Sequence, residues 1–498
     1  MHTGRILLAL ALAAGLCGCT APAPIPTPTP AATPAPAPTA APTPALTPAA
    51  AQAPTRTGTP EQALSGVRLA EDVTPELLFA ETWLAGVAEP DALLLDSAGI
   101  AAQNAANAKA LAPDDRWFDL AAVSQTGTMP GARVRALLAA DPALPGADCI
   151  NGAPMPEGYA AALQANRNEA AVPEPVSLRF GVTVRRVNVR TQPTDDFAGG
   201  CGERIYDDLQ QAELYWNEPV LVLHESADGA WLYILADRMP GWVPRESVAC
   251  FATREAWLDW QSPADFLVVT GARMRLDHNV ENTALSEREL AMGTVLPLAD
   301  AAEAPQSLYG RVPYGNYIAK MPLRGADGCV EPALVPVPVS APVHRGWLTF
   351  TRRALLAQMF ALQGQNYGWG GMQGANDCSG TVCQIYHCFG FTLPRNSKSL
   401  SMMDCATVEL AGLPDAAART DALAGLAPGA VLYMPGHIML YLGQRGGHAY
   451  VLSAVGTFTD AVGGAAHRAN TMTLTTLDVQ RGGGKSWLQD LRCAKILG

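Results

Sequence analysis

The spacing of apolar and polar residues divides the chain after residue 60 into segments of different character. Residues 61–180 are rich in Ala and Leu and are interrupted by turns that contain proline, which predicts a helical N-terminal domain. Short alternating runs follow and predict two β-rich domains, at 181–255 and 263–345. Residues 350–498 combine helical spacing with strand-like alternation. The chain is therefore expected to be multidomain, with an α+β domain at its C-terminus.

The first 60 residues have a different pattern, which predicts a targeting signal followed by a linker. Arg5 precedes an apolar run at 6–18, too short for the ~20 residues that cross a bilayer. The run ends in Leu-Cys-Gly-Cys, which resembles a bacterial lipobox with Cys19 as the lipidated residue. Residues 1–19 are thus expected to be a lipoprotein signal peptide; an ordinary signal peptide cut nearby is the alternative. Thr20 rather than Asp follows the Cys, so the resemblance implies export to the periplasmic face of an outer membrane.

Residues 20–60 are nearly all Ala, Pro and Thr. Such a segment cannot bury a core, and its prolines favour an extended polyproline II conformation. We expect it to be a linker between the lipid anchor and the folded domains.

The charge balance excludes one class of partner. The chain has 34 Lys and Arg against 46 Asp and Glu, a net charge of −12, and no long basic run. Binding to nucleic acid needs clustered cations, so we expect no nucleic-acid partner.

The first β-rich segment carries a recognisable motif. It opens with Asn188-Val189-Arg190 and a turn at Pro193, and closes with Gly241-Trp242-Val243. This pattern resembles the bacterial SH3-like barrel, a small domain that binds or positions other molecules. Residues 263–345 match the same pattern less well. The expectation is two SH3-like β-barrels in tandem.

Cys378 has the local sequence of a nucleophile. It follows a Gly-rich segment at 364–371, and Val382, Ile385 and Tyr386 recur after it at helical spacing. A Cys at a helix N-terminus is expected to be stabilised as the thiolate by unpaired N–H groups and the helix dipole.

A metal site is the alternative use of the three cysteines on this helix. Cys378, Cys383 and Cys388 are spaced by five residues, so each side chain is turned about 140° from the one before it. They point in three directions, and we expect no metal and no cofactor.

A nucleophilic Cys needs a base, and His437 is the candidate. Two strands are predicted at 430–434 and 437–443, joined by Pro435 and Gly436. Alternation places His437 on one face of its strand while Ile438 and its alternate neighbours pack into a core. A lone His is more often structural, but its combination with the Cys378 segment favours catalysis.

These motifs together resemble a known family. The segments YGWGG…DCSG, LPRNS and PGHIMLYLG are similar to those of the NlpC-type cell-wall cysteine peptidases, which have a papain-like fold. The resemblance covers about 350–498, and the order of the domains is similar to that of a multidomain subgroup with SH3-like domains. The implied activity is that of a γ-D-glutamyl-L-diamino acid endopeptidase acting on peptidoglycan stem peptides. A monomer is expected.

The resemblance also implies roles for single residues. Cys378 matches the nucleophile, His437 the base, and Tyr367 a residue that helps to hold the reacting carbonyl. The implied substrate-binding residues are Trp369, Asp377, Ser379, Arg395 and Ser397. The Arg395 guanidinium is suited to a carboxylate of the stem peptide.

The chain departs from the family at the third catalytic position, where His, Asn or Gln is common. Pairing the strand at 450–455 with the His437 strand, through a turn near 444–446, places Ser453 opposite His437. We therefore expect a Cys–His dyad weakly assisted by the Ser453 hydroxyl. Asn396 is a second departure, since related enzymes often have Asp there.

Two other functions are compatible with the sequence. A papain-like acyltransferase or amidase would keep the same nucleophile and change the acceptor. A wall-binding lipoprotein with a decayed catalytic site would explain the Ser at position 453.

The remaining cysteines leave two interpretations open. Cys17 falls in the predicted signal peptide, and besides Cys19 and Cys378 eight others remain, which permits up to four disulfides in an oxidising compartment or a set of buried free thiols. The eight are Cys149, Cys201, Cys250, Cys329, Cys383, Cys388, Cys405 and Cys493.

Overall fold

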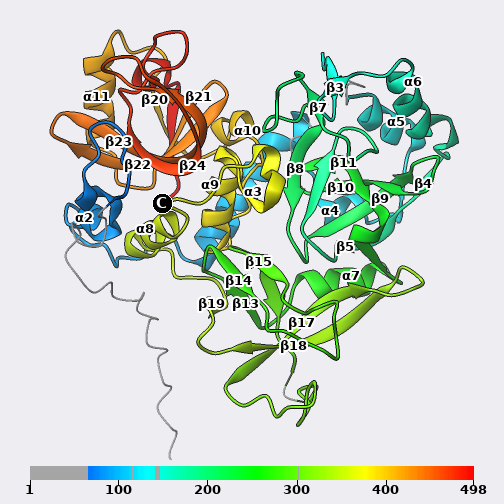
Figure 1. Cartoon of the computed structure of the whole chain (residues 1–498). Helices are drawn as coiled ribbons and strands as arrows, with labels where there is room; N and C mark the ends of the chain where they lie inside the picture. Colours follow the sequence, from blue (N-terminus) through cyan, green and yellow to red (C-terminus); the bar gives the residue numbers. More distant parts are fainter. Residues whose placement is uncertain (1–65, 115–116, 141–145, 301) are drawn as a thin grey trace, which may run out of the picture. The chain divides into compact units, whose positions relative to one another are not determined.

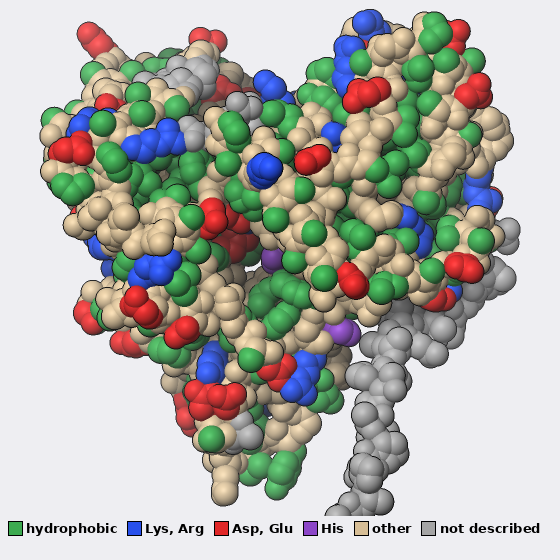
Figure 2. All heavy atoms as spheres, turned by 180° about the vertical axis from the view of Figure 1, so that it is seen from behind, with side chains coloured by type: hydrophobic (Ala, Val, Ile, Leu, Met, Phe, Trp, Pro, Cys, Tyr) green, Lys and Arg blue, Asp and Glu red, His purple; other side chains and the backbone are tan. Residues whose placement is uncertain are grey.

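A computed structural model describes residues 66–114, 117–140, 146–300 and 302–498. The predicted signal peptide, the linker and Cys19 lie outside the described residues. Within the described part of the chain, no helix is both long and apolar enough to cross a membrane. On the face shown in Figure 2, acidic and basic side chains are interspersed with hydrophobic ones, without a continuous basic patch.

The N-terminal segment is helical, as its Ala-rich sequence predicts, but its helices are short. The longest, α3, begins after Asp96, whose carboxylate accepts a hydrogen bond from the Gly99 N–H at 2.8 Å. The helices and strands of this segment are η1 (Pro75–Leu78), α2 (Ala80–Leu84), α3 (Ser97–Leu111), η2 (Ala112–Asp114), α4 (Leu120–Val123), β1 (Thr128–Met129), α5 (Gly131–Ala140), β2 (Cys149–Ile150), β3 (Ala153–Pro154), α6 (Tyr159–Asn166), η3 (Glu169–Ala171) and β4 (Val176–Ser177).

This segment does not bury a single core of its own, which differs from the expected helical domain at 61–180. Trp83 and Ile100 belong to the core of the C-terminal domain, whereas Val134 and Leu138 pack with Trp242 of the first β-rich domain. Its apolar side chains are instead divided between the cores of the two neighbouring domains. Figure 1 shows α3 beside α9 of the C-terminal domain, and α4 and α5 beside the first set of strands.

The first β-rich segment forms one seven-stranded antiparallel sheet in the order β12-β5-β9-β10-β11-β6-β8. In β9, Val220 and Val222 pack into one core while Leu221 and Leu223 pack into another, so both faces of the strand are covered. The elements are β5 (Arg179–Thr183), β6 (Val187–Arg190), β7 (Ala198–Gly199, paired with β2), β8 (Gln210–Leu214), β9 (Pro219–Glu225), β10 (Trp231–Ala236), β11 (Met239–Pro244), η4 (Arg245–Ser247), β12 (Val248–Phe251) and α7 (Arg254–Gln261).

The second β-rich segment forms three small sheets around one core. The sheets are β16-β13-β19, β14-β15 and β17-β18, and Leu267, Leu290 and Val335 meet between them. That this segment is an SH3-like barrel stays a prediction. Its strands are β13 (Phe266–Val269), β14 (Arg273–Arg275), β15 (Glu289–Ala291), β16 (Val295–Pro297), β17 (Asn316–Arg324), β18 (Val330–Pro338) and β19 (Val343–Arg345).

The C-terminal segment has the expected α+β organisation. Its antiparallel sheet runs β20-β25-β21-β22-β23-β24, and Figure 1 shows it curled in orange and red next to the yellow α8 and α9. The elements are α8 (Arg352–Ala361), η5 (Trp369–Gly374), α9 (Cys378–His387), α10 (Ser397–Ser401), β20 (Ala406–Glu409), α11 (Ala416–Ala424), β21 (Val431–Met434), β22 (His437–Arg445), β23 (His448–Thr459), β24 (Ala466–Thr476), α12 (Trp487–Asp490) and β25 (Cys493–Ile496).

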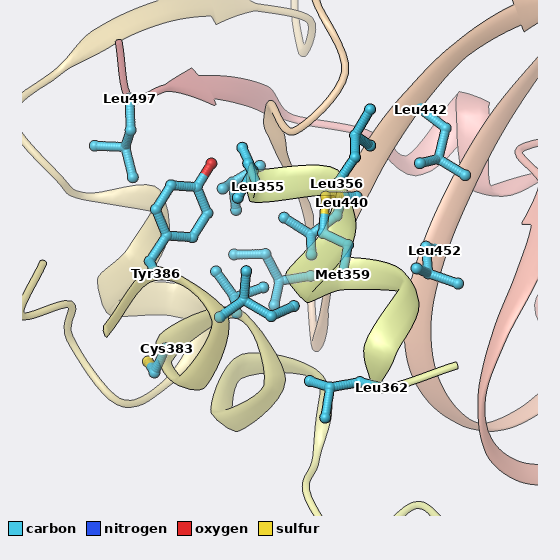
Figure 3. Close-up of a cluster of buried hydrophobic side chains, with 14 of the residues drawn as sticks. Leu355, Leu356, Met359, Leu362, Cys383, Tyr386, Leu440, Leu442, Leu452 and Leu497 are labelled. Atoms are coloured by element: carbon cyan, nitrogen blue, oxygen red, sulfur yellow. The ribbon is translucent and has the colours of Figure 1, made fainter. Parts of the chain in front are cut away.

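Alternation along β22 decides what lies on each side of this sheet. Ile438, Leu440 and Leu442 pack toward α8 and α9, whereas Met439 and Tyr441 fill a second core on the other face. Figure 3 shows the first of these cores, with leucines of α8 facing Leu440 and Leu442, and with Tyr386 of α9 beside them. This core holds α9 against the strand that carries His437.

The cysteines take both of the forms that the sequence allowed. Cys149 and Cys201 form a disulfide, which links the N-terminal segment to the first β-rich domain. The seven other cysteines of the described residues are free thiols. Two of these are buried on α9: Cys383 Sγ donates to the Pro394 carbonyl at 3.3 Å, and Cys388 Sγ to the Gln384 carbonyl at 3.6 Å.

Candidate active site

Cys378 is the first residue of α9, as its sequence predicts. Asp377 is the N-cap, and its Oδ1 accepts hydrogen bonds from the Gly380 N–H at 2.7 Å and the Ser379 hydroxyl at 3.1 Å. The cap fixes the first turn of the helix. It therefore also fixes the position of the Cys378 side chain.

Arg395 has a different partner from the expected one. Its Nη1 and Nη2 donate to the two oxygens of Asp377 at 2.9 and 3.0 Å, and Nη1 also donates to Ser379 Oγ at 3.0 Å. The Arg395 residue is only 6% exposed. The sequence implied a substrate carboxylate as its partner, but the guanidinium holds the helix cap instead, because Asp377 satisfies it in bidentate geometry.

The glycines before Cys378 allow close contact with the first β-rich domain. Gly370 and Gly371 have φ of 56° and 87°. A Cβ on Gly370 would lie 2.6 Å from Gln210, and one on Gly371 would lie 2.3 Å from Glu213. Any side chain here would push η5 away from β8. The Gly370 N–H also donates to Asp377 Oδ2 at 3.1 Å, which ties the loop to the helix cap.

Arg186 of the first β-rich domain holds the same loop from the other side. It donates to the carbonyls of Gly374 at 2.6 Å and Ala375 at 2.5 Å, and it forms a salt bridge with Glu213. Burial raises the pKa of Glu213 to about 7, while the Arg186 guanidinium opposes this rise. The loop that leads into Cys378 is thus positioned by two domains.

His437 begins β22, directly after the Pro435–Gly436 turn, and is buried. Its Nε2 lies 3.2 Å from Ser453 Oγ, so the structure brings together the two residues that the sequence pairs. The predicted register is nevertheless wrong. Leu440 pairs with Leu452, and an irregularity lies between Tyr441 and Gly443. In this register Ser453 is diagonal to His437 on the neighbouring strand rather than directly opposite. The imidazole still reaches the Ser453 hydroxyl across this diagonal.

We expect Ser453→Ala to lower kcat by about two- to tenfold, because a neutral hydrogen bond contributes about 0.5–1.5 kcal/mol. Steady-state kinetics on the peptide substrate measure this. Ser453→Thr, which keeps the hydroxyl, is the control and should retain most of the rate. Unchanged kinetics in Ser453→Ala would show that Ser453 does not orient the imidazole.

A cleft of about 980 Å³ contains both reacting side chains. It is formed by the C-terminal domain together with Tyr206, Gln210, Gln211, Arg238 and Met239 of the first β-rich domain. Of the predicted catalytic and substrate-binding residues, all except Ser453, which is buried behind His437, line it: Tyr367, Trp369, Asp377, Cys378, Ser379, Arg395, Ser397 and His437. Their roles in binding remain predictions.

The electrostatics of the site favour neutral reacting groups. Burial, with a smaller contribution from the Asp377 carboxylate, raises the pKa of Cys378 to about 12, although the N–H groups of Ile438 and Ser379 lower it. Burial and the positive charge of Arg481 lower the pKa of His437 to about 4. The helix N-terminus was expected to stabilise a thiolate, but desolvation outweighs it. The resting site therefore holds a thiol and a neutral imidazole.

The acid limb of kcat/KM is expected near pH 4, since only neutral His437 can accept the thiol proton. Arg481 donates to the Pro435 carbonyl at 2.7 Å, in the turn before His437. In Arg481→Gln the positive charge is lost, so the pKa of His437 should rise toward its ordinary value of 6.5. The acid limb of kcat/KM should then move to higher pH.

A kcat/KM profile from pH 3.5 to 8 checks this, with circular dichroism confirming that the fold persists at each pH. Arg481→Lys keeps the charge and should keep the wild-type profile. If Arg481→Gln had the same acid limb as the wild type, the electrostatic role of Arg481 would be wrong.

Tyr206 is a cleft residue that sequence reasoning missed. Its ring centroid lies 5.4 Å from that of Trp369 and 6.3 Å from that of Tyr367. It comes from the loop between β7 and β8, where aromatic residues of a barrel are expected to be core. A Cβ on Gly456 would lie 1.9 Å from the Tyr206 hydroxyl, so the glycine makes room for the ring. Only the pairing of two domains reveals this contact.

Comparisons with known proteins agree with this geometry. Residues 364–456 match the family model described as NlpC/P60 family, and residues 199–244 match the model described as SH3 domain (SH3b1 type). A search of curated protein sequences finds no match to this chain.

Solved structures show a similar fold. The NlpC/P60 endopeptidase from Photobacterium damselae subsp. piscicida superposes with a TM-score of 0.66 at 18% identity, over 84% of this chain and 96% of that chain. An NlpC/P60 family protein from Bacillus cereus gives a TM-score of 0.39 at 16% identity, over 58% of this chain and 82% of that chain. The similarity to the Photobacterium protein, together with the two matching family models, confirms the multidomain architecture with its α+β domain. The C-terminal domain of this chain belongs to the NlpC/P60 family of cysteine peptidases, and an SH3 domain of the SH3b1 type precedes it.

Proposed function

We propose that this protein is a cell-wall endopeptidase that hydrolyses the γ-D-glutamyl-diamino acid bond of peptidoglycan stem peptides. The observation that carries the proposal is the cleft, whose lining includes both Cys378, at the start of α9, and His437, at the start of β22. Family membership supports a cell-wall cysteine peptidase. The choice of bond rests on the resemblance of the sequence motifs.

The first chemical step follows from the protonation states. As Cys378 Sγ attacks the γ-glutamyl carbonyl, its proton passes to neutral His437. A thiolate–imidazolium pair therefore does not have to form before the attack. The imidazolium then donates this proton to the leaving amine of the diamino acid. Water deprotonated by His437 releases the acyl group from Cys378. The hydroxyl of Ser453 keeps the ring in one orientation through Nε2.

Stabilisation of the oxyanion is assigned to groups at the start of α9. The Ser379 N–H already points at Cys378 Sγ, where it lowers the pKa of the thiol. Burial raises the pKa of the Tyr367 hydroxyl, and the nearby Cys378 and Asp377 raise it further. The hydroxyl therefore stays protonated and able to donate a hydrogen bond.

The first β-rich domain supports a short substrate. Tyr206, Gln210 and Gln211 line the cleft from that domain, and Tyr206 meets Trp369 edge to face. A groove bounded in this way suits the free end of a trimmed stem peptide rather than the middle of a cross-linked wall.

The cellular location is part of the proposal and rests on the first 60 residues. Lipidation of Cys19 would hold the enzyme at the periplasmic face of the outer membrane, with 20–60 as the tether. In Cys19→Ser the protein should move from the membrane fraction to the soluble fraction after cell lysis, which immunoblotting of the two fractions measures. An unchanged distribution would contradict the lipid anchor.

The proposed activity is tested by incubating the full chain with L-Ala-γ-D-Glu-diaminopimelate and following release of the diamino acid by mass spectrometry. The α-linked isomer of the same tripeptide is the matched control and should not be cut. Cys378→Ala is expected to release nothing.

Other outcomes separate the alternatives. If an added amine acceptor captured the L-Ala-D-Glu acyl group in place of water, the protein would be an acyltransferase. If neither the tripeptide nor longer stems were cut while wild type and Cys378→Ala bound cell walls equally, a wall-binding lipoprotein would replace the proposal.

A further inference from the structure

Two free thiols lie next to each other where the two β-rich domains meet. Cys250 is in β12, the edge strand of the first sheet, and Cys329 is in the turn between β17 and β18. They are Cα partners in an isolated parallel β-bridge, and the Cys250 N–H donates to the Gly328 carbonyl at 3.0 Å. Within the described residues, neither cysteine takes part in a disulfide.

The backbone geometry fits a disulfide. Paired β-segments lie about 4.7–4.9 Å apart, and Cα atoms joined by a disulfide lie about 4.4–6.8 Å apart. Residues directly paired in a bridge place their side chains on the same face. The turn at Cys329 is also held, because Asp327 Oδ1 accepts the Cys329 N–H at 2.8 Å and the Gly325 N–H donates to the Cys329 carbonyl at 2.9 Å.

One thiol of the pair is accessible to an oxidant. Cys329 is exposed and Cys250 is half-buried, so a reagent reaches at least the first thiol. Burial raises the pKa of Cys250, and the Asp327 side chain raises that of Cys329, while the positive charge of Arg324 opposes the rise at both cysteines. The Cys149–Cys201 disulfide elsewhere in the chain is an independent sign that the protein exists in an oxidising environment.

We infer that Cys250 and Cys329 form a second disulfide, which locks the second β-rich domain onto the first. The oxidant is a disulfide compound, either a small molecule or a thiol–disulfide oxidoreductase. One thiolate attacks a sulfur of the oxidant, forms a mixed disulfide and releases one thiol. The other cysteine attacks this mixed disulfide, the Cys250–Cys329 bond forms and the second thiol leaves. Two electrons and two protons pass to the oxidant in total.

The proposed disulfide is relevant to the active site because the second β-rich domain contacts the loop that precedes Cys378. Arg273 donates to the Gly374 carbonyl at 3.0 Å, the same atom that Arg186 of the first domain holds. The loop closed by the new bond contains β13 to β17, so it fixes the domain that carries Arg273. The disulfide would therefore stabilise the assembly that positions Cys378 without touching the cleft.

The test is peptide mapping of the full chain. The protein is reduced, then incubated under native conditions with oxidised glutathione, alkylated and digested with trypsin without reduction. The expected product is peptide 246–254 linked to peptide 325–345, with a mass two hydrogens below their sum. Alkylation of both cysteines, or only their glutathione adducts, in samples where Cys149–Cys201 has formed would overturn the inference.

Variants give a second readout that does not depend on mapping. Oxidised wild type should have a higher Tm than the protein whose pair is reduced, and Cys250→Ser or Cys329→Ser should remove this difference while leaving the initial peptidase rate unchanged. Cys405→Ser, which removes a half-buried thiol outside the pair, is the control and should keep the linked peptide. An equal response of Tm to reduction in wild type and Cys250→Ser would contradict the bond.

Discussion

Cys378→Ala is expected to lower the rate of peptide hydrolysis by at least about 10⁴-fold, because loss of a nucleophile removes the covalent route altogether. The structure gives this residue no substitute. It sits at the start of α9 in the cleft, while Cys383 and Cys388 of the same helix point into protein, where their sulfurs donate to carbonyls. Single-turnover release of the diamino acid measures the residual rate.

The matched control is Cys383→Ala, which removes a thiol from the same helix outside the cleft and should retain most of the activity. Thermal unfolding of Cys378→Ala should resemble that of the wild type, since the Cys378 side chain lines the cleft and is only partly buried. Residual hydrolysis within tenfold of wild type would mean that another residue attacks the substrate.

Arg395→Met is expected to have the second largest effect, a loss of about 3–5 kcal/mol in the free energy of unfolding. The guanidinium makes two hydrogen bonds to Asp377 and one to Ser379, and both charged side chains are largely excluded from solvent. Its loss leaves a buried carboxylate at the helix cap without a cation. The variant should also be nearly inactive, because the first turn of α9 then loses its support. Urea denaturation measures the stability.

A double-mutant cycle separates the ion pair from packing. Asp377→Asn keeps an N-cap side chain and removes the charge. If the ion pair dominates, the free energy of unfolding lost in the double variant should be clearly smaller than the sum of the losses in the two single variants. A loss below about 1 kcal/mol in Arg395→Met would contradict the proposed role.

The sequence predicted the contacts that depend on local pattern. Helical spacing after Cys378 placed the thiol at a helix N-terminus, and alternation along β22 placed His437 on the face away from Ile438. The contact between His437 and Ser453 was also foreseen, although for the wrong register, because an irregularity between Tyr441 and Gly443 has no signature in the residue pattern.

What the sequence did not predict depends on partners distant in the chain. Arg395 was assigned to a substrate because nothing local shows that Asp377, 18 residues earlier, satisfies it. Nothing in the local sequence singles out Tyr206, which lies against a glycine of β23 and two aromatic rings of the C-terminal domain. The protonation of Cys378 was misjudged for a similar reason, since burial by several elements outweighs the dipole of one helix.

The divided packing of the N-terminal segment has a consequence for the time at which the protein can fold. Trp83 stacks with Tyr450 at 5.4 Å, and the Tyr450 hydroxyl donates to the Asp72 carbonyl at 2.9 Å. The last leucine, Leu497, belongs to the same core as Trp83. The residues around Trp83 thus acquire these apolar partners only after the C-terminal domain has been synthesised. Such long-range contacts form late, so the packing of this part of the N-terminal segment depends on the completed C-terminal domain.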